Sequence, residues 1–177
     1  LQHYRLQRNL EILVVDASRG FGNGRCLPAG PLREPASRRY EADLTVCNGG
    51  PFPGGQAMEL VPGRLISLDD QERFRDLSEL RRQRVTAVAG IGNPERFFAL
   101  LRRHGLHLDE RPYPDHHLFS REEVAAWPAG PVIMTEKDAV KCESFARREH
   151  WYLPVTARLD SGFERLLSDK LEGIENG

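Results

Sequence analysis

The chain has 177 residues, with 25 Lys or Arg, 26 Asp or Glu, and 40% hydrophobic residues. These values are ordinary for a globular protein of one domain or two small ones, and the net charge of −1 excludes a whole-chain field that would attract nucleic acid. Any anion site must therefore be local. Three cysteines without C-x-x-C spacing disfavour both a zinc site and a disulfide framework.

The first predicted strand, residues 11–15, is an apolar run typical of a buried parallel strand, and it leads into a long loop, residues 16–35. Ligands of open α/β sheets bind outside the carboxyl ends of the strands, where this loop begins. Its glycines allow backbone N–H groups to approach an anion, and Arg19, Arg25 and Arg33 supply planar guanidinium groups suited to phosphate. The residue types leave an anion site and a proline-stiffened turn equally open.

A second strand is predicted at residues 43–47, and it ends in a linker rich in glycine and proline, residues 48–55. Beyond the linker, residues 57–61 and 64–68 flank a Pro-Gly turn pair, and we expect them to form a two-stranded ribbon. This part of the chain therefore reads as a connection between two regions.

From residue 84 onward, strands and helices alternate, which predicts a second α/β layer structure. The helices have clear start signals, namely an Asn-Pro pair, a Ser-Arg-Glu-Glu capping box and a Thr-Glu-Lys-Asp sequence. Strands are predicted at residues 85–89, 106–108, 131–135 and 151–155, and helices after residues 93, 120 and 135 and around residues 163–174.

Three short segments of this second region could carry chemistry. Asp115 precedes His116 and His117 in a predicted loop, where an acid–base role competes with the commoner solvated histidine. The Gly-Ile-Gly-Asn-Pro sequence at residues 90–94 could cradle an anion at a helix N-terminus, but the missing G-x-G-x-x-G spacing favours an ordinary turn. Residues 135–138 are more typical of a helix cap than of a site. The chain has no G-x-x-x-x-G-K-[ST] phosphate loop.

Taken in order, the motifs of the chain resemble the tetraacyldisaccharide 4′-kinases, the lipid A 4′-kinases of Gram-negative bacteria. Each motif alone is weak, but the ordered set is specific and spans essentially the whole chain. The motifs are Leu1-Gln-His-Tyr-Arg-Leu6, Arg19-Gly-Phe-Gly-Asn-Gly24 with Leu27-Pro-Ala-Gly-Pro-Leu-Arg-Glu-Pro35, Asn48-Gly-Gly50, Ala89-Gly-Ile-Gly-Asn-Pro94, Pro114-Asp-His-His117 and Thr135-Glu-Lys-Asp138.

The resemblance implies transfer of the γ-phosphate of ATP, with Mg²⁺, to the 4′-hydroxyl of a tetraacyldisaccharide 1-phosphate, giving lipid IVA. It implies a peripheral enzyme at the membrane surface on the cytoplasmic face of the inner membrane. The implied fold is α/β, with part of a P-loop-type α/β/α core followed by a smaller α/β/α domain that a two-stranded ribbon joins to it. On this basis we assign residues 1–52 to the core, 53–83 to the ribbon linker and 84–177 to the second domain.

The resemblance also assigns substrate-binding residues to the first region. Arg33 and Glu34 would line the phosphate and substrate side of the cleft that the family has between its domains. Arg19 and Asn23 would shape the same loop.

Further roles follow from the same resemblance at both ends of the match. Gln2 and His3 would fall just after the family's Asp-Asp-Gly motif, whose aspartates would manage Mg²⁺. His116, chosen over His117 because it follows Asp115, would assist a catalytic aspartate that lies upstream in the family. The P-loop half and the metal aspartates are absent from this chain, so we assign it no metal ligand and expect no turnover of ATP by it alone. The alternative is a non-catalytic module that binds an anionic sugar or lipid headgroup.

Overall fold

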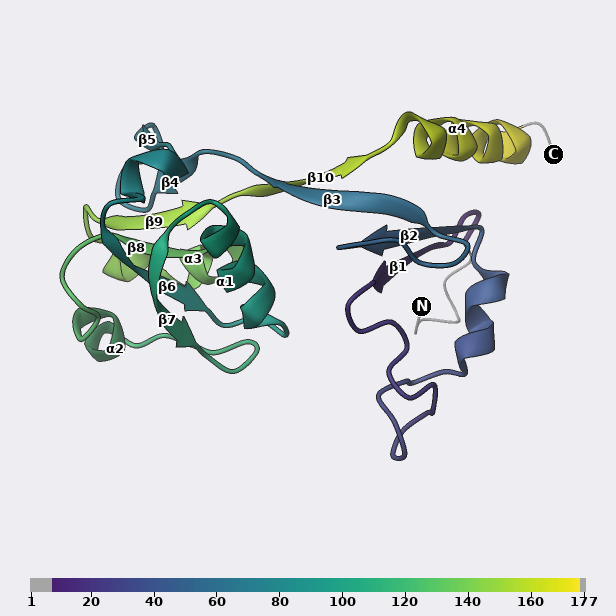
Figure 1. Ribbon diagram of the computed structural model, residues 1–177, viewed down its shortest axis with the longest axis horizontal. Helices are drawn as coiled ribbons and strands as arrows, with labels where there is room; N and C mark the ends of the chain where they lie inside the picture. Colours follow the sequence, from purple (N-terminus) through teal and green to yellow (C-terminus); the bar gives the residue numbers. More distant parts are fainter. Residues whose placement is uncertain (1–7, 176–177) are drawn as a thin grey trace. The chain divides into compact units, whose positions relative to one another are not determined.

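The computed structural model describes residues 8–175, which divide into two compact units (Figure 1). The first unit comprises the chain up to residue 61 together with the part from residue 156 onward. The second unit comprises residues 62–155. Each unit is built on its own β-sheet, and both sheets contain parallel strands. The predicted α/β class is therefore confirmed.

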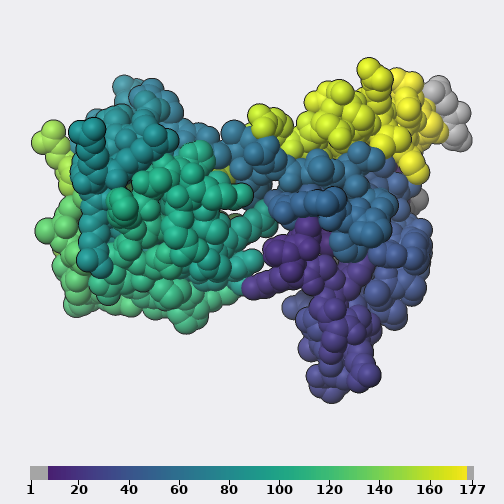
Figure 2. Space-filling model, viewed as in Figure 1, coloured from purple at the N-terminus to yellow at the C-terminus, as the bar shows by residue number. Residues whose placement is uncertain are grey.

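The first unit has a four-stranded sheet in the order β1-β2-β3-β10, in which β1, β2 and β3 are parallel. A 3₁₀ helix (Ala36–Glu41) precedes β2. The C-terminal helix α4 (Ser161–Glu175) lies against residues of the same unit in Figure 2, where it is yellow. The strands are β1 (Ile12–Asp16), β2 (Leu44–Asn48), β3 (Gln56–Pro62) and β10 (Val155–Leu159).

The core of the first unit is small. Phe163 of α4 packs with Leu44 and Val46 of β2 to form its buried cluster. On β1, Ile12 is 37% exposed and Val14 is 61% exposed. The prediction of a buried strand is therefore wrong for one face of β1, because no element within the described residues covers those two side chains.

The second unit has a six-stranded sheet in the order β5-β4-β9-β8-β6-β7. The strands from β9 to β7 are parallel, whereas β4 is antiparallel to both of its neighbours. The strands are β4 (Leu65–Ser67), β5 (Phe74–Arg75), β6 (Arg84–Ala89), β7 (His107–Pro112), β8 (Val132–Thr135) and β9 (His150–Leu153).

Helices cover both faces of this second sheet. Alternate residues of a strand point to opposite faces, so Val85 and Ala87 of β6 pack toward α1 (Pro94–Arg103) while Val88 packs in the cluster formed with α2 and α3. The predicted helices after residues 93, 120 and 135 are all present, and the last two are α2 (Arg121–Ala125) and α3 (Glu136–Cys142). The arrangement is a three-layer α/β/α unit.

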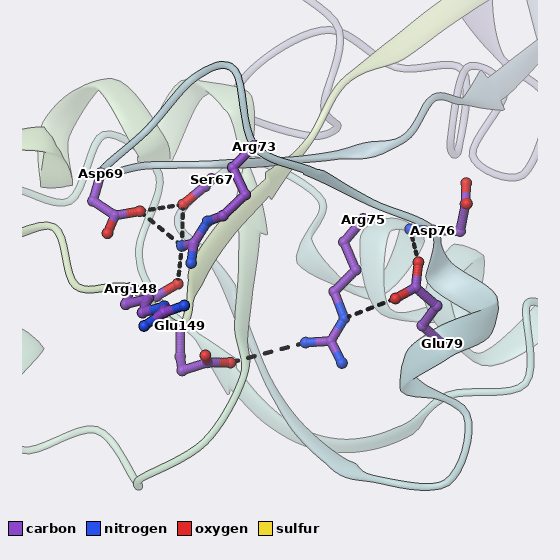
Figure 3. A network of polar contacts seen from close by, with 8 residues as sticks. All are labelled: Ser67, Asp69, Arg73, Arg75, Asp76, Glu79, Arg148 and Glu149. Carbon is purple, nitrogen blue, oxygen red and sulfur yellow. Dashed lines mark hydrogen bonds and ion pairs between the residues drawn. The ribbon is translucent and has the colours of Figure 1, made fainter.

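A network of polar side chains lies beside the antiparallel strands of this sheet (Figure 3). The guanidinium of Arg73 donates to the Ser67 hydroxyl at 2.7 Å, to Asp69 at 2.8 Å and to the carbonyl oxygen of Arg148. It also lies 4.7 Å from the centroid of the Trp151 ring. The hydrogen bond from the Ser67 hydroxyl is the main cause that lowers the pKa of Asp69, and the positive charge of Arg73 lowers it further. One charged side chain thus connects β4 with the segment that leads into β9.

The two strands that were predicted to form a ribbon with each other pair with other strands instead. Residues 57–61 do not pair with residues 64–68, because β3 is hydrogen-bonded to β2 and β10, whereas β4 is bonded to β5 and β9. The Pro-Gly pair is the point where the chain leaves one sheet for the other, and not a hairpin turn.

The predicted boundaries also differ from those of the units. The expected second domain, residues 84–177, includes residues from 156 onward that belong to the first unit. The physical reason is that β10 returns to pair with β3 and that Phe163 is buried against β2. Within the described residues, no helix has both the length and the apolar character needed to cross a bilayer.

Candidate active site

The long loop after β1 in the first unit is shaped by its own polar contacts. The side-chain amide of Asn23 donates to the carbonyl oxygen of Ala29 at 2.9 Å, and its oxygen accepts from the N–H of Arg25 at 3.1 Å. A Cβ at Gly30 would lie 2.2 Å from that same oxygen, so only glycine fits at this close approach. Asn23 therefore folds the loop back on itself.

The C-terminal end of this loop and the 3₁₀ helix enclose a hollow of about 230 Å³. Arg33 and Glu34 lie in its wall, and their assignment to the phosphate and substrate side of a cleft stays a prediction. Basic and apolar side chains share this wall, an arrangement suited to an anionic ligand that carries apolar groups. The lining residues are Leu13, Phe21, Leu32, Arg33, Glu34, Pro35, Ala36, Arg38, Arg39 and Ala42.

Two arginines of this hollow were not identified from the sequence. Arg38 is surrounded by carboxylates, with Glu11 and Glu41 each at 3.1 Å and Glu34 at 3.7 Å. Desolvation opposes these contacts, but the charges of Glu41 and Glu11 prevail and raise the pKa of Arg38. The guanidinium of Arg39 lies 4.5 Å from the Tyr40 ring centroid. The adjacent Arg-Arg pair was the sequence signal that could have found them.

The other predicted residues of the first unit lie elsewhere. Arg19 is exposed on the turn after β1, where its N–H donates to the carbonyl oxygen of Asp16 at 3.2 Å. Neither Arg19 nor Asn23 lines the hollow. Gln2 and His3 fall outside the described residues. Of the six predicted substrate-binding residues, the hollow therefore brings together Arg33 and Glu34.

In the second unit, the chemistry-bearing segments meet at the carboxyl edge of the parallel strands. Gly90 follows β6, Asp115 follows β7 and Thr135 ends β8. A Cβ at Gly90 would lie 3.4 Å from the carbonyl oxygen of Pro114, and one at Gly92 would lie 3.4 Å from Oδ2 of Asp115. The turn after β6 and the loop after β7 are therefore in contact, at the edge where ligands of parallel sheets bind.

His117 is held by its neighbours in this loop. Its Nε2 lies 3.1 and 3.2 Å from the two carboxylate oxygens of Glu123, and its ring stacks on Tyr113 with centroids 4.7 Å apart. The hydrogen bond from the backbone N–H of Ser120 is the main cause that lowers the pKa of Glu123, and the hydrogen bond with His117 lowers it further. These contacts anchor the loop to α2 and its capping box.

His116 has the opposite character. Its side chain is 92% exposed, and its φ angle of 61° is the only positive one of a non-glycine residue in the described chain. The N–H of His116 donates to Oδ1 of Asp115 at 3.1 Å, and its Nε2 lies 3.8 Å from Oδ2. A left-handed conformation costs a side-chain-bearing residue about 1 kcal/mol or more, and such strain concentrates at functional sites. His116 therefore presents its ring to solvent beside a carboxylate.

The acidic residues and histidines of the described chain are dispersed. Within residues 8–175, no three His, Cys, Asp or Glu side chains come together in a way that could hold a metal ion.

Comparison with known proteins identifies the family of this α/β chain. The family model described as tetraacyldisaccharide-1-P 4′-kinase matches residues 1–172. The chain belongs to this family.

Relatives in the family are substantially similar. A tetraacyldisaccharide 4′-kinase of Methylobacillus flagellatus is 47% identical over 172 residues, which are 97% of this chain and 50% of that protein. One from Nitrosococcus oceani is 51% identical over 165 residues, covering 92% of this chain and 48% of that protein. The chain thus spans about half the length of the curated relatives it matches.

One solved structure is similar to the chain in fold. It is a crystal structure of LpxK from Aquifex aeolicus, described as an "apo" form in complex with ATP. The two share 24% sequence identity with a TM-score of 0.66, over 98% of this chain and 55% of that one. This likeness concerns the fold alone.

Proposed function

We propose that this chain is part of a lipid A 4′-kinase, which transfers the γ-phosphate of ATP to the 4′-hydroxyl of a tetraacyldisaccharide 1-phosphate to give lipid IVA. The family match over residues 1–172 supports this activity. ATP and Mg²⁺ are the proposed cofactors, and the cytoplasmic face of the inner membrane is the proposed place of work. The observation that carries the residue assignment is the strained, exposed His116 beside Asp115 at the sheet edge.

The proposed division of labour follows the chemistry of the side chains. Phosphoryl transfer depends on positioning the reactants and on neutralising the negative charge that spreads over the transferred group. Arg33 and Glu34 of the first unit would contact the phosphate and the sugar, because they line a hollow that is both basic and apolar. His116 would assist the catalytic base as a polar partner, with Asp115 orienting it.

The whole protein, rather than this half-length chain, is the object to assay. The full-length enzyme should transfer radiolabelled phosphate from ATP to a tetraacyldisaccharide 1-phosphate, and degradation of the product should locate the label at the 4′ position. Label on any other hydroxyl would contradict the proposal. The 177-residue chain alone should give no turnover, because it lacks a phosphate loop. Binding of the disaccharide by a full-length enzyme without transfer would favour the non-catalytic alternative.

The role of Arg33 can be tested in the same assay. Arg33→Ala should lower kcat/KM by at least about tenfold, because it removes a guanidinium that stabilises phosphate charge. Arg165→Ala is the matched control, since Arg165 is an exposed arginine on α4 of the same unit and should leave kcat/KM unchanged. An unaltered kcat/KM for both substrates in Arg33→Ala would contradict its assignment.

A further inference from the structure

Asp138 has a carboxylate that is fully buried in the second unit. Its Oδ2 accepts hydrogen bonds from the N–H of Gly90 at 2.9 Å and from the hydroxyl of Thr135 at 2.6 Å, and its Oδ1 accepts from Nζ of Lys141 at 2.9 Å. Burying a carboxylate costs several kcal/mol unless charges and hydrogen bonds compensate it. Three donors satisfy this one.

Capping of α3 accounts for only part of the contacts of this buried group. The N-cap of the helix is Thr135, whose side-chain oxygen accepts from the N–H of Asp138 at 3.2 Å. That bond uses the backbone of Asp138, and the Thr135 hydroxyl in turn donates to Oδ2 of its carboxylate. What the carboxylate holds besides its own helix is the N–H of Gly90, on the turn between β6 and α1.

Gly90 packs closely against both the Asp138 carboxylate and the loop that carries His116. A Cβ at this position would lie 3.0 Å from Oδ1 of Asp138, 3.4 Å from the carbonyl oxygen of Pro114 and 3.5 Å from Cβ of His117. The carboxylate and the loop therefore both lie close to the one Cβ position of this glycine. Any shift of this turn must be transmitted to the loop, because closely packed interiors leave no free space.

We propose that Asp138 is a positioning residue, which sets the place of the Asp115–His116 pair by holding the N–H of Gly90, with Thr135 and Lys141 fixing the carboxylate. The inference rests on the proposed function, because it gives the held loop a role in phosphoryl transfer. Asp138 does not touch a reacting group. Its effect on catalysis passes through the turn after β6.

Asp138→Asn is the informative substitution. An amide has nearly the same size as the carboxylate, but one of its two polar atoms is a donor, which must face either the N–H of Gly90 or the ammonium of Lys141. One of these groups then loses its acceptor. We expect kcat to fall by about tenfold or more, with KM for ATP and for the disaccharide changed less than about threefold, because a fully buried residue that acts through the turn contacts neither substrate.

A double-mutant cycle in the full-length enzyme tests the coupling. If Asp138 acts through His116, Asp138→Asn should lower kcat in the wild-type background and have less than about a twofold effect in the His116→Ala background. A merely structural role would give the same loss in both backgrounds. Lys137→Ala, an exposed neighbour on α3, is the matched control and should leave kcat unchanged. Unfolding followed by tryptophan fluorescence verifies that each variant is folded, since Trp127 and Trp151 both lie in the second unit.

Gly90→Ala provides a second test that leaves every charge in place. Its new Cβ would press on the Asp138 carboxylate and on the loop, so kcat should fall, again with no further loss in the His116→Ala background. Should Asp138→Asn not fold, this variant decides the matter. A wild-type kcat in either folded variant would overturn the positioning role of Asp138 and leave the proposed function standing. A loss of kcat that adds to the loss in His116→Ala would do the same. Wild-type kcat in His116→Ala itself would overturn both the catalytic assignment and the positioning role.

Discussion

The sheet of the second unit is covered by helices on both faces, whereas one face of β1 in the first unit carries exposed apolar side chains within the described residues. The second unit has two large buried clusters, and the cluster of the first unit comprises Leu44, Val46 and Phe163. The two candidate site regions reflect this contrast. Around His116, a buried carboxylate, an aromatic stack and a capping box fix the loop, while the Arg33 hollow is shaped by exposed loops and ion pairs.

The contrast shows that tight packing around a loop is what makes it rigid. A residue is held in a strained backbone conformation only when its surroundings determine its place. The ring of His116 is itself exposed, and its packed neighbour His117, which stacks on Tyr113, fixes the backbone of the loop. The first unit offers guanidinium groups on a lightly packed loop. We therefore expect substitutions in the second core to have larger effects on stability than equivalent changes in β1.

The largest expected effect is loss of core packing in the second unit. Leu101→Ala removes a fully buried side chain of α1 and should lower the free energy of unfolding by about 4 kcal/mol, because it leaves a cavity. Urea unfolding of the chain followed by tryptophan fluorescence measures it. Val140→Ala, at a position of α3 that is 67% exposed, is the control and should have little effect. A loss below about 1 kcal/mol in Leu101→Ala would contradict the view that the second unit has the more tightly packed core.

Acid should destabilise the second unit through His150. Desolvation, followed by the charge of Arg147, lowers the pKa of this buried histidine from 6.5 to about 4. Between these values the unfolded chain binds more protons than the folded one, so stability is lost as the pH falls from about 6.5 to about 4. The loss should reach about 3 kcal/mol.

This prediction has a direct control in His150→Gln, which removes the titrating group. Urea unfolding at several pH values should show a steeper loss of stability for the wild type than for the variant across that window. Parallel pH profiles for the two proteins would contradict the effect of burial on His150.

The smallest expected effect lies on the exposed face of β1. Val14→Ala should change the stability of the first unit by less than about 0.5 kcal/mol, because the side chain is already 61% exposed. The rate at which the buried thiol of Cys47 is labelled reports opening of this unit. Val46→Ala, which truncates a side chain only 3% exposed, should accelerate labelling strongly. A large effect of Val14→Ala would show that its face is covered.

Local signals in the sequence predicted much of the second unit. The Asn-Pro pair before α1, the capping box at Ser120 and the Thr135 cap each fix a helix start within a few residues. Alternating apolar residues marked the strands between them. These features depend on neighbours in the chain, and so they can be read without knowledge of the fold.

Long-range features could not be predicted in the same way. The pairing of β10 with β3 joins segments about a hundred residues apart, and nothing local in either strand names its partner. The choice between His116 and His117 is similar, because adjacent residues have the same local sequence. The contacts of His117 with Glu123 and Tyr113 distinguish them only in the folded unit.

The most direct test of the account is the turnover of His116→Ala in the full-length enzyme. We expect kcat to fall by about 100-fold or more while ATP still binds, since a residue that assists the base is lost. His107→Ala is the matched control, because His107 is an exposed histidine on β7 of the same unit, and its kcat should equal that of the wild type. An unchanged kcat in folded His116→Ala would contradict the assignment of His116 to the chemistry.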